Sequence, residues 1–469
     1  MNIIEDTYFM DKSKALTVAL KQNKFGPYGN LQLCYYDGSV IADGPKNLIH
    51  LPWEQMELLL TMDTRWPTSI DCENNLQRVS YEKDFIERIE ALNICKMQRH
   101  QEFLNTLKVT PLNFSEPLRV YIAVEHYAKV VRHASENVAN TFRALGYQVF
   151  FDINDNTEDL TDYRRAKNMA SFLPHMCLTI NRLHNLQISD ETFNFIWFQD
   201  PTLILYDSST LNVRDRDYFF YLIEPLKDAL IKKNIPDSKT FYQPFSIDFQ
   251  QYELDEVIER QEKIVFIGQN YFEVVSPTKE YKDCSFVQEL AELFNTISIT
   301  PALLSDFYQK HASSIRRQEH IEMHIYPAVV RCEVVKWMCL HSDIPVEVYG
   351  YGWENIPEIT PYYKGVLTYG EEIAKVLYGS KYSLACHSQF YYQQRVFEAS
   401  YCGCIPVIYE DILNSESFHH HNNSLIFKNS KELKASLLSV PSEDPFKISQ
   451  DMSYHGFIEK MVSIVKNES

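Results

Sequence analysis

The sequence lacks any apolar run approaching 18 residues, so it offers no candidate for a membrane-spanning helix. Its first residues, Met1-Asn-Ile-Ile-Glu-Asp6, are already acidic and are not followed by the apolar core of a secretory signal. The ten cysteines include no C-x-x-C pair, which argues against a disulfide framework and against a zinc site. We therefore expect a soluble, cytoplasmic protein, for which peripheral contact with a membrane is left open.

Positive charge is also in short supply. Lysine and arginine total 45 and aspartate and glutamate total 63, which gives a formal net charge of −18. Because nucleic acids repel such a chain, a nucleic-acid partner is disfavoured, although a local basic groove stays open. The consecutive His419, His420 and His421 point in different directions, which indicates a solvated loop rather than a metal site.

The chain is long enough, at 469 residues with 45% hydrophobic residues, for two or three cores. We expect four parts: an α+β extension (1–115), two α/β domains (116–248 and 249–430) and a helical segment (431–469) that packs back across the domains. In the extension, Tyr36-Asp37-Gly38 predicts a hairpin turn, and apolar spacing predicts a helix over about 81–107. The proline-bounded stretch 111–117 is predicted to be the first linker.

Two series of alternating strands and helices follow the linker. The first is predicted to have strands at 120–124, 148–151, 177–180, 194–198 and 202–206, with a helix from 135 to 145. The chain is expected to cross to the second series at Ile247-Asp248. That series has predicted strands at 263–268, 346–350, 382–385 and 405–408, and predicted helices at 285–340, 371–377 and 394–401. This rhythm predicts two Rossmann-like domains.

The stretch from Ser383 to Ile408 is where we expect chemistry, because ligands of open α/β sheets bind beyond the carboxyl ends of strands. Arg395 and Glu398 are three residues apart, so they share one face of a helix. An arginine there can neutralise a diphosphate, and the carboxylate can accept hydrogen bonds from ribose hydroxyls. The alternative is an exposed ion pair on a solvated helix.

The same stretch resembles a known family, the CgeB-like glycosyltransferases related to spore maturation proteins. The family's motif is R-x-F-E-A-x-x-x-G-x-x-x-[VIL], and this chain has Arg395-Val-Phe-Glu-Ala-Ser-Tyr-Cys-Gly403-Cys-Ile-Pro-Val407. Further segments resemble the family's glycine turns, loops and N-terminal pattern, over about 120–430 in all: Phe266-Ile-Gly268, Val348-Tyr-Gly-Tyr-Gly-Trp353, Tyr363-Lys-Gly365, Trp197-Phe-Gln-Asp-Pro201 and Gln243-Pro-Phe-Ser-Ile-Asp248. Residues 1–115 lie outside the resemblance.

This resemblance implies a GT-B fold, in which two Rossmann-like domains face each other across a cleft. It implies that residues 116–248 bind the acceptor and residues 249–430 a nucleotide sugar, with a UDP-sugar expected ahead of a GDP- or dTDP-sugar. Glu398 would hold the ribose, and Lys364 and Arg395 would be the diphosphate cations, with Arg331 as a third candidate. Gly268, Gly350 and Gly352 would let the backbone approach the donor, although a plain turn explains the last two equally well. No metal and no cofactor are expected.

The catalytic base is a separate question. Glu125, His126 and Asp200 follow predicted strands at their carboxyl ends, and any of them could act as the base of an inverting enzyme. Glu410 follows Glu398 at a spacing that differs from the better-known retaining pattern, which leaves the stereochemistry open.

The predicted function is transfer of a hexose or related sugar (EC 2.4 class) to a glycan, a protein or a small molecule. The alternatives are an inactive GT-B-like binding or scaffolding protein, a non-hydrolysing epimerase and a DNA-modifying glycosyltransferase.

Overall fold

The computed structural model divides the chain into two compact units. One comprises Met1–Tyr221, Leu226–Phe241 and Met461–Ser469, and the other Leu222–Pro225 and Tyr242–Lys460. The structure describes residues 8–10, 15, 34–36, 48–50, 69–71, 91, 94–95, 97–115, 117–125, 129–154, 161–185, 187–200, 202–206, 211–274, 278, 281–296, 299–312, 318, 320–388, 393–411, 424–438 and 452–468. Residues His419 to His421 lie outside this set.

Four short strands near the N-terminus form one sheet in the order β3-β2-β1-β4. Their bounds are Tyr8–Met10 (β1), Cys34–Tyr36 (β2), Leu48–His50 (β3) and Ser69–Asp71 (β4). The predicted hairpin at Tyr36 is wrong, because β2 pairs in parallel with both β1 and β3. A two-residue turn joins antiparallel strands only, whereas parallel neighbours need a longer crossover. Within the segment predicted as a helix over about 81–107, the described residues from 97 to 108 are helical.

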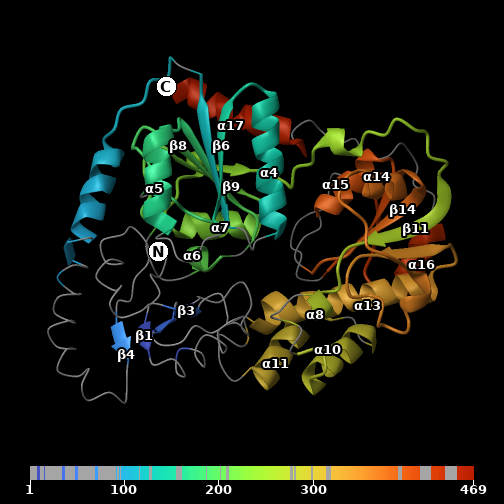
Figure 1. The fold of residues 1–469 in the computed structure, drawn as a ribbon. Helices are drawn as coiled ribbons and strands as arrows, with labels where there is room; N and C mark the ends of the chain where they lie inside the picture. The colour runs from blue at the N-terminus through green and yellow to red at the C-terminus, as the bar shows by residue number, and fades with distance from the viewer. Residues whose placement is uncertain are drawn as a thin grey trace. The chain divides into compact units, whose positions relative to one another are not determined.

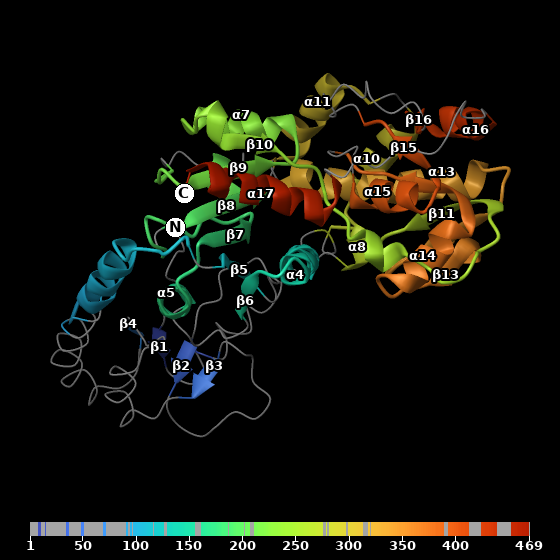
Figure 2. The same cartoon turned by 90° about the horizontal axis from the view of Figure 1, so that it is seen from above.

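A six-stranded parallel sheet forms the core of the first unit, in the order β10-β9-β8-β7-β5-β6. Figure 2 shows these strands following one another across the sheet. The strands are Arg119–Glu125 (β5), Gln148–Asn154 (β6), Met176–Ile180 (β7), Phe193–Phe198 (β8), Asp217–Tyr221 (β9) and Thr240–Tyr242 (β10). The helices are Lys129–Ala144 (α4), Thr161–Phe172 (α5), Leu203–Tyr206 (α6) and Glu224–Lys232 (α7). Gly146, with φ of 86°, follows α4 as predicted.

The predicted strand at 202–206 is wrong, because Leu203–Tyr206 is the short helix α6. A short apolar run does not distinguish a buried strand from a buried helical turn. Here the amide of Leu205 donates to the carbonyl of Thr202 and closes a turn. The next strand of the sheet is instead Asp217–Tyr221, which the sequence pattern did not predict.

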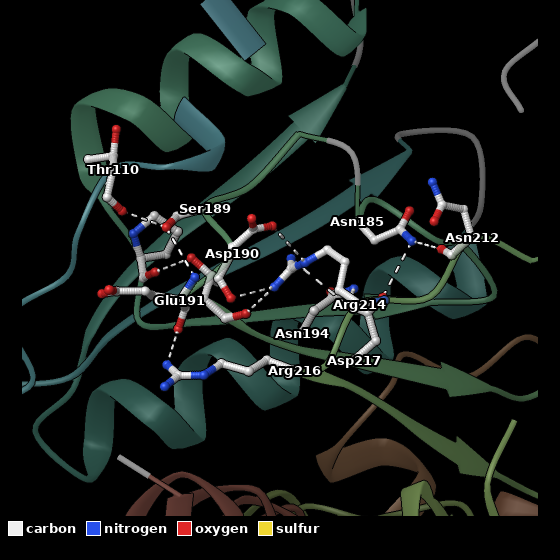
Figure 3. A network of polar contacts seen from close by, with 12 residues as sticks. Thr110, Asn185, Ser189, Asp190, Glu191, Asn194, Asn212, Arg214, Arg216 and Asp217 are labelled. Carbon is white, nitrogen blue, oxygen red and sulfur yellow. Dashed lines mark hydrogen bonds and ion pairs between the residues drawn. The ribbon is translucent and has the colours of Figure 1, made fainter. Parts of the chain in front are cut away.

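A buried polar network lies at the amino ends of β8 and β9 (Figure 3). Asp217, the fully buried first residue of β9, accepts hydrogen bonds from Asn194 Nδ2 at 3.1 Å and from the amide of Arg214 at 2.8 Å. Ser189 Oγ donates to the carbonyl of Thr110 at 2.6 Å and so ties the predicted linker segment to the domain. Because ligands of such sheets bind at the opposite, carboxyl edge, we assign this network a structural role.

The second unit contains another six-stranded parallel sheet, ordered β13-β12-β11-β14-β15-β16. Its strands are Gln261–Ile267 (β11), Val346–Tyr349 (β12), Tyr363–Gly365 (β13), Ser380–Ala385 (β14), Ile405–Tyr409 (β15) and Leu425–Phe427 (β16). Numbered along the chain, this is the order 3-2-1-4-5-6 of dinucleotide-binding domains, and the first unit has the related order 2-1-3-4-5-6. The predicted pair of Rossmann-like domains is therefore confirmed.

Helices cover both faces of the second sheet. Successive side chains of β11 point to opposite faces, and each set packs into a different core cluster. Ile264 and Phe266 belong to a core cluster with Ser285–Thr296 (α10), Pro301–His311 (α11) and Tyr326–His341 (α13). Val265 and Ile267 belong to a second cluster with Glu371–Tyr378 (α14) and Gln394–Tyr401 (α15). Figure 1 shows α14 and α15 on one side of β11 and β14, with α10 and α13 on the other.

The helical region predicted over 285–340 is interrupted. Thr300 caps α11 by accepting the amide of Leu303, and Pro301 occupies the first turn, where its missing N–H is tolerated. A π-helical turn, Ile321–Ile325 (η5), leads into α13. The remaining elements of this unit are Phe249–Tyr252 (η4), Tyr271–Val274 (α8), Thr360–Tyr362 (η6) and Ser430–Leu438 (α16). Helix α17, Tyr454–Glu468, begins in this unit, and its residues from Met461 on belong to the first.

Candidate functional site

Strands β11 and β14 are parallel neighbours, and the strands that follow them, β12 and β15, lie on opposite sides of this pair, so the strand order reverses between them. The crevice beyond their carboxyl ends is where ligands bind in sheets of this kind. Gly268 follows β11, and Cys386 and His387 follow β14. Helix α15, with Arg395 and Glu398, comes next along the chain.

Glu398 is almost fully buried, at 1% exposure, which rules out the alternative of a solvated surface carboxylate. Its Oε1 accepts hydrogen bonds from the hydroxyl of Tyr369 at 2.9 Å and from Gln394 Nε2 at 2.9 Å. Its Oε2 forms an ion pair with Nη1 of Arg395. The structure therefore brings Arg395 and Glu398 together, as their spacing predicted, and both carboxylate oxygens are engaged.

A fully buried and a partly buried phenol, Tyr252 and Tyr369, complete this cluster. Gln394 Nε2 also donates to the hydroxyl of Tyr369 at 2.6 Å, and Tyr252, from η4, lies beside Tyr369 with its ring fully buried. Burial and the nearby charge of Glu398 raise the pKa of both phenols. Burial lowers the pKa of Arg395, but Glu398 and the phenols outweigh that effect, so its pKa is raised. Arg395 therefore keeps its positive charge at neutral pH.

Sequence reasoning missed Tyr252, Tyr369 and Gln394 as members of the cluster. Gln394 had a usable signal, since it is four residues before Glu398 on the same helix face. The two tyrosines come from separate segments, so no local spacing connects them with Glu398.

Arg331, on α13, is buried at the turn that follows β11. Its guanidinium lies 4.0 Å from the ring centroid of Tyr271, and its Nη1 makes a long contact of 3.5 Å with the carbonyl of Gln269. Among the described residues no carboxylate forms an ion pair with Arg331, and its Nε has no acceptor. The described part of the chain thus supplies no carboxylate that compensates this positive charge.

The charge of Arg331 also acts on the loop after β14. Burial raises the pKa of the Cys386 thiol to about 12, and burial together with Arg331 lowers the pKa of His387 to about 3. His387 is therefore neutral at physiological pH. Arg331 thus contacts the turn after β11 and lowers the pKa of His387 in the loop after β14.

The glycine turns after β11 and β12 pack directly against each other. A Cβ on Gly350, whose φ is 128°, would lie 2.1 Å from the carbonyl oxygen of Gly268. A Cβ on Gly352, whose φ is 85°, would lie 2.5 Å from Cβ of Glu273, and the indole of Trp353 donates to the Gly268 carbonyl at 2.6 Å. Packing between the two turns is sufficient to require glycine at both positions.

Of the other predicted residues, Lys364 belongs to the same unit as this cluster and the rest belong to the first unit. Lys364 is exposed on the edge strand β13, which β12 and β11 separate from β14. In the first unit, Asp200 follows β8 and accepts a hydrogen bond from Asn181 Nδ2 at 2.8 Å. Glu125 ends β5, while its side chain and the whole of His126 lie outside the described residues.

Comparison with known families adds a decisive observation. Residues 331–448, which include Arg331, Arg395 and Glu398, match the family model described as glycosyl transferase-like. This segment is therefore similar to glycosyl transferase-like domains. The predicted functional class, a glycosyltransferase with an unspecified acceptor, is therefore confirmed, and the CgeB-like branch stays a prediction.

Several solved structures resemble the whole chain weakly. A glycosyltransferase from Rickettsia africae ESF-5 is 8% identical, with 75% of this chain and 98% of that chain covered and a TM-score of 0.40. The UDP-GlcNAc 2-epimerase from Methanocaldococcus jannaschii is 8% identical, with 74% and 100% covered and a TM-score of 0.37. Sucrose-phosphate synthase from Thermosynechococcus elongatus is 9% identical, with 74% and 94% covered and a TM-score of 0.39. Similarities at this level carry no argument about function.

No curated protein sequence matches the chain. In the part of the chain that the structure describes, no helix is long and apolar enough to cross a membrane. The same residues contain no group of three or more side chains that could hold a metal ion. The expectation of a metal-independent reaction stays a prediction.

Proposed function

We propose that the glycosyltransferase domain binds a nucleotide-sugar donor at the carboxyl edge of its sheet, between the ends of β11 and β14. Arg331 is the observation that carries this proposal, because it is buried and no carboxylate among the described residues pairs with it. A buried guanidinium in that state is costly unless an anion binds it. Departure of a nucleoside diphosphate also needs its growing negative charge stabilised.

The Arg395–Glu398 pair contributes in a different way. Its two charges cancel, so in this state it adds little net attraction for a diphosphate. A ribose diol can take the place of Arg395 at Oε2 of Glu398, and the released guanidinium can then turn to the diphosphate. Tyr369 and Gln394 keep Oε1 in place during this exchange.

The sugar passes to an acceptor hydroxyl of a glycan, a protein or a small molecule. We assign the acceptor to the N-terminal Rossmann-like domain and the role of base to Asp200, whose pKa is raised by desolvation. A UDP-sugar is the donor that we expect first, and Lys364 stays a candidate for phosphate contact.

A thermal-shift screen against UDP, GDP, dTDP and CMP and their sugars tests the proposal. A ligand at about 100 times its dissociation constant adds roughly 2.7 kcal/mol to the unfolding free energy, so one of these nucleotides should raise Tm clearly. If none does, the scaffolding alternative replaces the enzyme.

A further inference from the structure

The buried cluster around Glu398 contains a hydrogen-bond donor and a hydrogen-bond acceptor that are both unused. The hydroxyl of Tyr252 is buried and donates to no acceptor among the described residues. Oε2 of Glu398 is also buried, and it accepts no hydrogen bond from the described residues, since Arg395 holds it through an ion pair. Buried polar atoms are normally hydrogen-bonded, so this pair of atoms needs an explanation.

The Tyr252 hydroxyl lies beside the ion pair. Tyr252 is the last residue of η4, and its fully buried ring packs with α14 and α15 and meets Tyr369 edge-on. Burial raises the pKa of Tyr252 and the charge of Glu398 raises it further, while Arg395 acts in the opposite direction. Burial lowers the pKa of Arg395, whereas Glu398 and then Tyr252 raise it. These mutual effects indicate that the hydroxyl is close to both members of the pair.

The other carboxylate oxygen of Glu398 has no room for a further donor. Its Oε1 already accepts from the hydroxyl of Tyr369 and from Nε2 of Gln394, each at 2.9 Å. A carboxylate oxygen has two lone pairs, so these two hydrogen bonds occupy both. A hydrogen bond from Tyr252 to the carboxylate must therefore go to Oε2, the oxygen that Arg395 holds in this state.

Release of Arg395 would leave Oε2 in need of donors. In the proposed exchange the guanidinium turns to the diphosphate, and a ribose hydroxyl approaches Oε2. A buried carboxylate that loses its cation is destabilised unless hydrogen bonds take the place of the ion pair. The ribose supplies one donor to Oε2, and the Tyr252 hydroxyl is a donor of the protein itself that is not engaged elsewhere in the described cluster.

We propose that Tyr252 is a positioning residue of Glu398, whose hydroxyl donates to Oε2 once the ribose displaces Arg395 and so holds the carboxylate in the orientation that binds the ribose. This inference rests on the proposed function and adds a residue to it. A nucleotide without ribose hydroxyls leaves the ion pair closed. Tyr252 should therefore matter only for nucleotides that carry those hydroxyls.

Isothermal titration calorimetry with UDP and 2′,3′-dideoxy-UDP tests the inference. Tyr252→Phe should weaken UDP binding about 10- to 100-fold, which is the effect of losing a hydrogen bond to a charged group, and leave the affinity for 2′,3′-dideoxy-UDP unchanged. The Tm of the ligand-free variant should not fall, because the substitution keeps the ring and removes an unpaired hydroxyl. A loss of affinity for both nucleotides alike, or for neither, would overturn the positioning role.

Tyr308→Phe is the matched control. Tyr308, on α11, is also buried, and no described residue forms a hydrogen bond with its hydroxyl. It belongs to the core cluster of Ile264 and Phe266, whereas Tyr252 belongs to that of Val265 and Ile267. Its substitution should change the Tm of the ligand-free protein as Tyr252→Phe does and leave both affinities at wild-type values. Equal losses of UDP affinity in the two variants would contradict the proposal.

A double-mutant cycle shows whether Tyr252 acts through Glu398. In Glu398→Gln the side-chain oxygen can keep the hydrogen bonds from Tyr369 and Gln394, so an amide nitrogen replaces Oε2 and offers Tyr252 no acceptor. Adding Tyr252→Phe to this variant should therefore lower the UDP affinity no further. Losses that add fully would show that Tyr252 acts independently of Glu398, which overturns the inference.

Failure of the proposed function would look different. If none of the nucleotides or nucleotide sugars raises the wild-type Tm, the donor site itself is wrong. If the wild type binds UDP and Tyr252→Phe binds it equally well, only the role of Tyr252 is wrong.

Discussion

The guanidinium of Arg331 stacks on the ring of Tyr271, 4.0 Å from its centroid. This contact holds a buried positive charge at the turn after β11 without neutralising it. A cation–π contact stabilises an arginine side chain. It leaves the N–H groups able to donate hydrogen bonds in the plane of the guanidinium. In the proposed donor site, Arg331 can therefore bind an anion without rearrangement, whereas Arg395 must first separate from Glu398.

Arg331→Met should weaken UDP binding by about 10- to 100-fold, since a hydrogen bond to a charged group is worth about 1.5–3 kcal/mol. Arg331→Lys should recover only part of this, because lysine lacks the planar group that stacks on Tyr271. Isothermal titration calorimetry measures both. Lys434→Met removes an exposed charge that pairs with Asp343 on the same domain, and it should leave the UDP affinity unchanged.

Glu398→Gln should abolish the preference of the protein for UDP over 2′,3′-dideoxy-UDP. In the proposed site the carboxylate accepts hydrogen bonds from the ribose hydroxyls, so its loss should matter only for a ligand that has them. Both substitutions remove the charge that pairs with Arg395, but glutamine is a better test than alanine because it keeps the side-chain volume and an oxygen that can accept from Tyr369 and Gln394. Competition binding with the two nucleotides measures the effect.

Glu410→Gln is the control for Glu398→Gln, since Glu410 pairs with Lys428 and is partly exposed. It should keep the wild-type preference for the ribose. An equal loss of preference in both variants, or in neither, would contradict the assignment of Glu398.

Gly403→Ala should destabilise the protein more than Gly146→Ala does. Both glycines follow helices with positive φ, so alanine strains the backbone at either position by about 1–2 kcal/mol. A Cβ on Gly403 would also lie 2.7 Å from Nη2 of Arg260, whereas nothing lies within 4 Å of one on Gly146. Urea unfolding measures the loss of stability in each variant, and the difference between the two losses reports the contact with Arg260. Equal losses would show that the Arg260 side chain moves away from the added Cβ at no cost.

His387→Gln should reduce the loss of stability on acidification. The pKa of His387 is about 3 in the folded state, mainly through burial, against about 6.5 in the unfolded chain. Between these values the unfolded chain binds a proton that the folded protein does not, so stability falls as the pH drops from about 6.5 toward 3. His184 changes in the same direction and will keep part of the effect. Denaturant midpoints at several pH values, with His341→Gln as control, measure the change.

Local patterns predicted the elements of the C-terminal domain well. Helix α15 has the predicted bounds, because Arg395 to Gly403 combines an apolar face with a terminating glycine. Local patterns failed at 202–206, where the same apolar run is compatible with a strand or a helical turn. They also failed at Tyr36, where a turn signal does not show which strands pair. Pairing partners are a property of the whole sheet.

The candidate site was predictable in outline only. Arg395 and Glu398 share a helix, so their spacing was sufficient to connect them. Arg331 and Tyr271 come from separate elements, and only the fold shows that no described carboxylate pairs with the arginine. Asn181 and Asp200 meet because β7 and β8 are adjacent, which no sequence spacing reveals.

The interlocked turns of Gly268 and Gly350 bear on attempts to engineer the donor preference. The contact between these two turns is made by backbone atoms, so it offers no side chain to substitute. A Cβ added at Gly350 would collide with the carbonyl of Gly268. Mutant libraries aimed at this part of the edge should yield mostly unfolded protein. Variants with altered sugar or base selectivity should therefore come from randomising positions whose side chains can change size without moving these two turns.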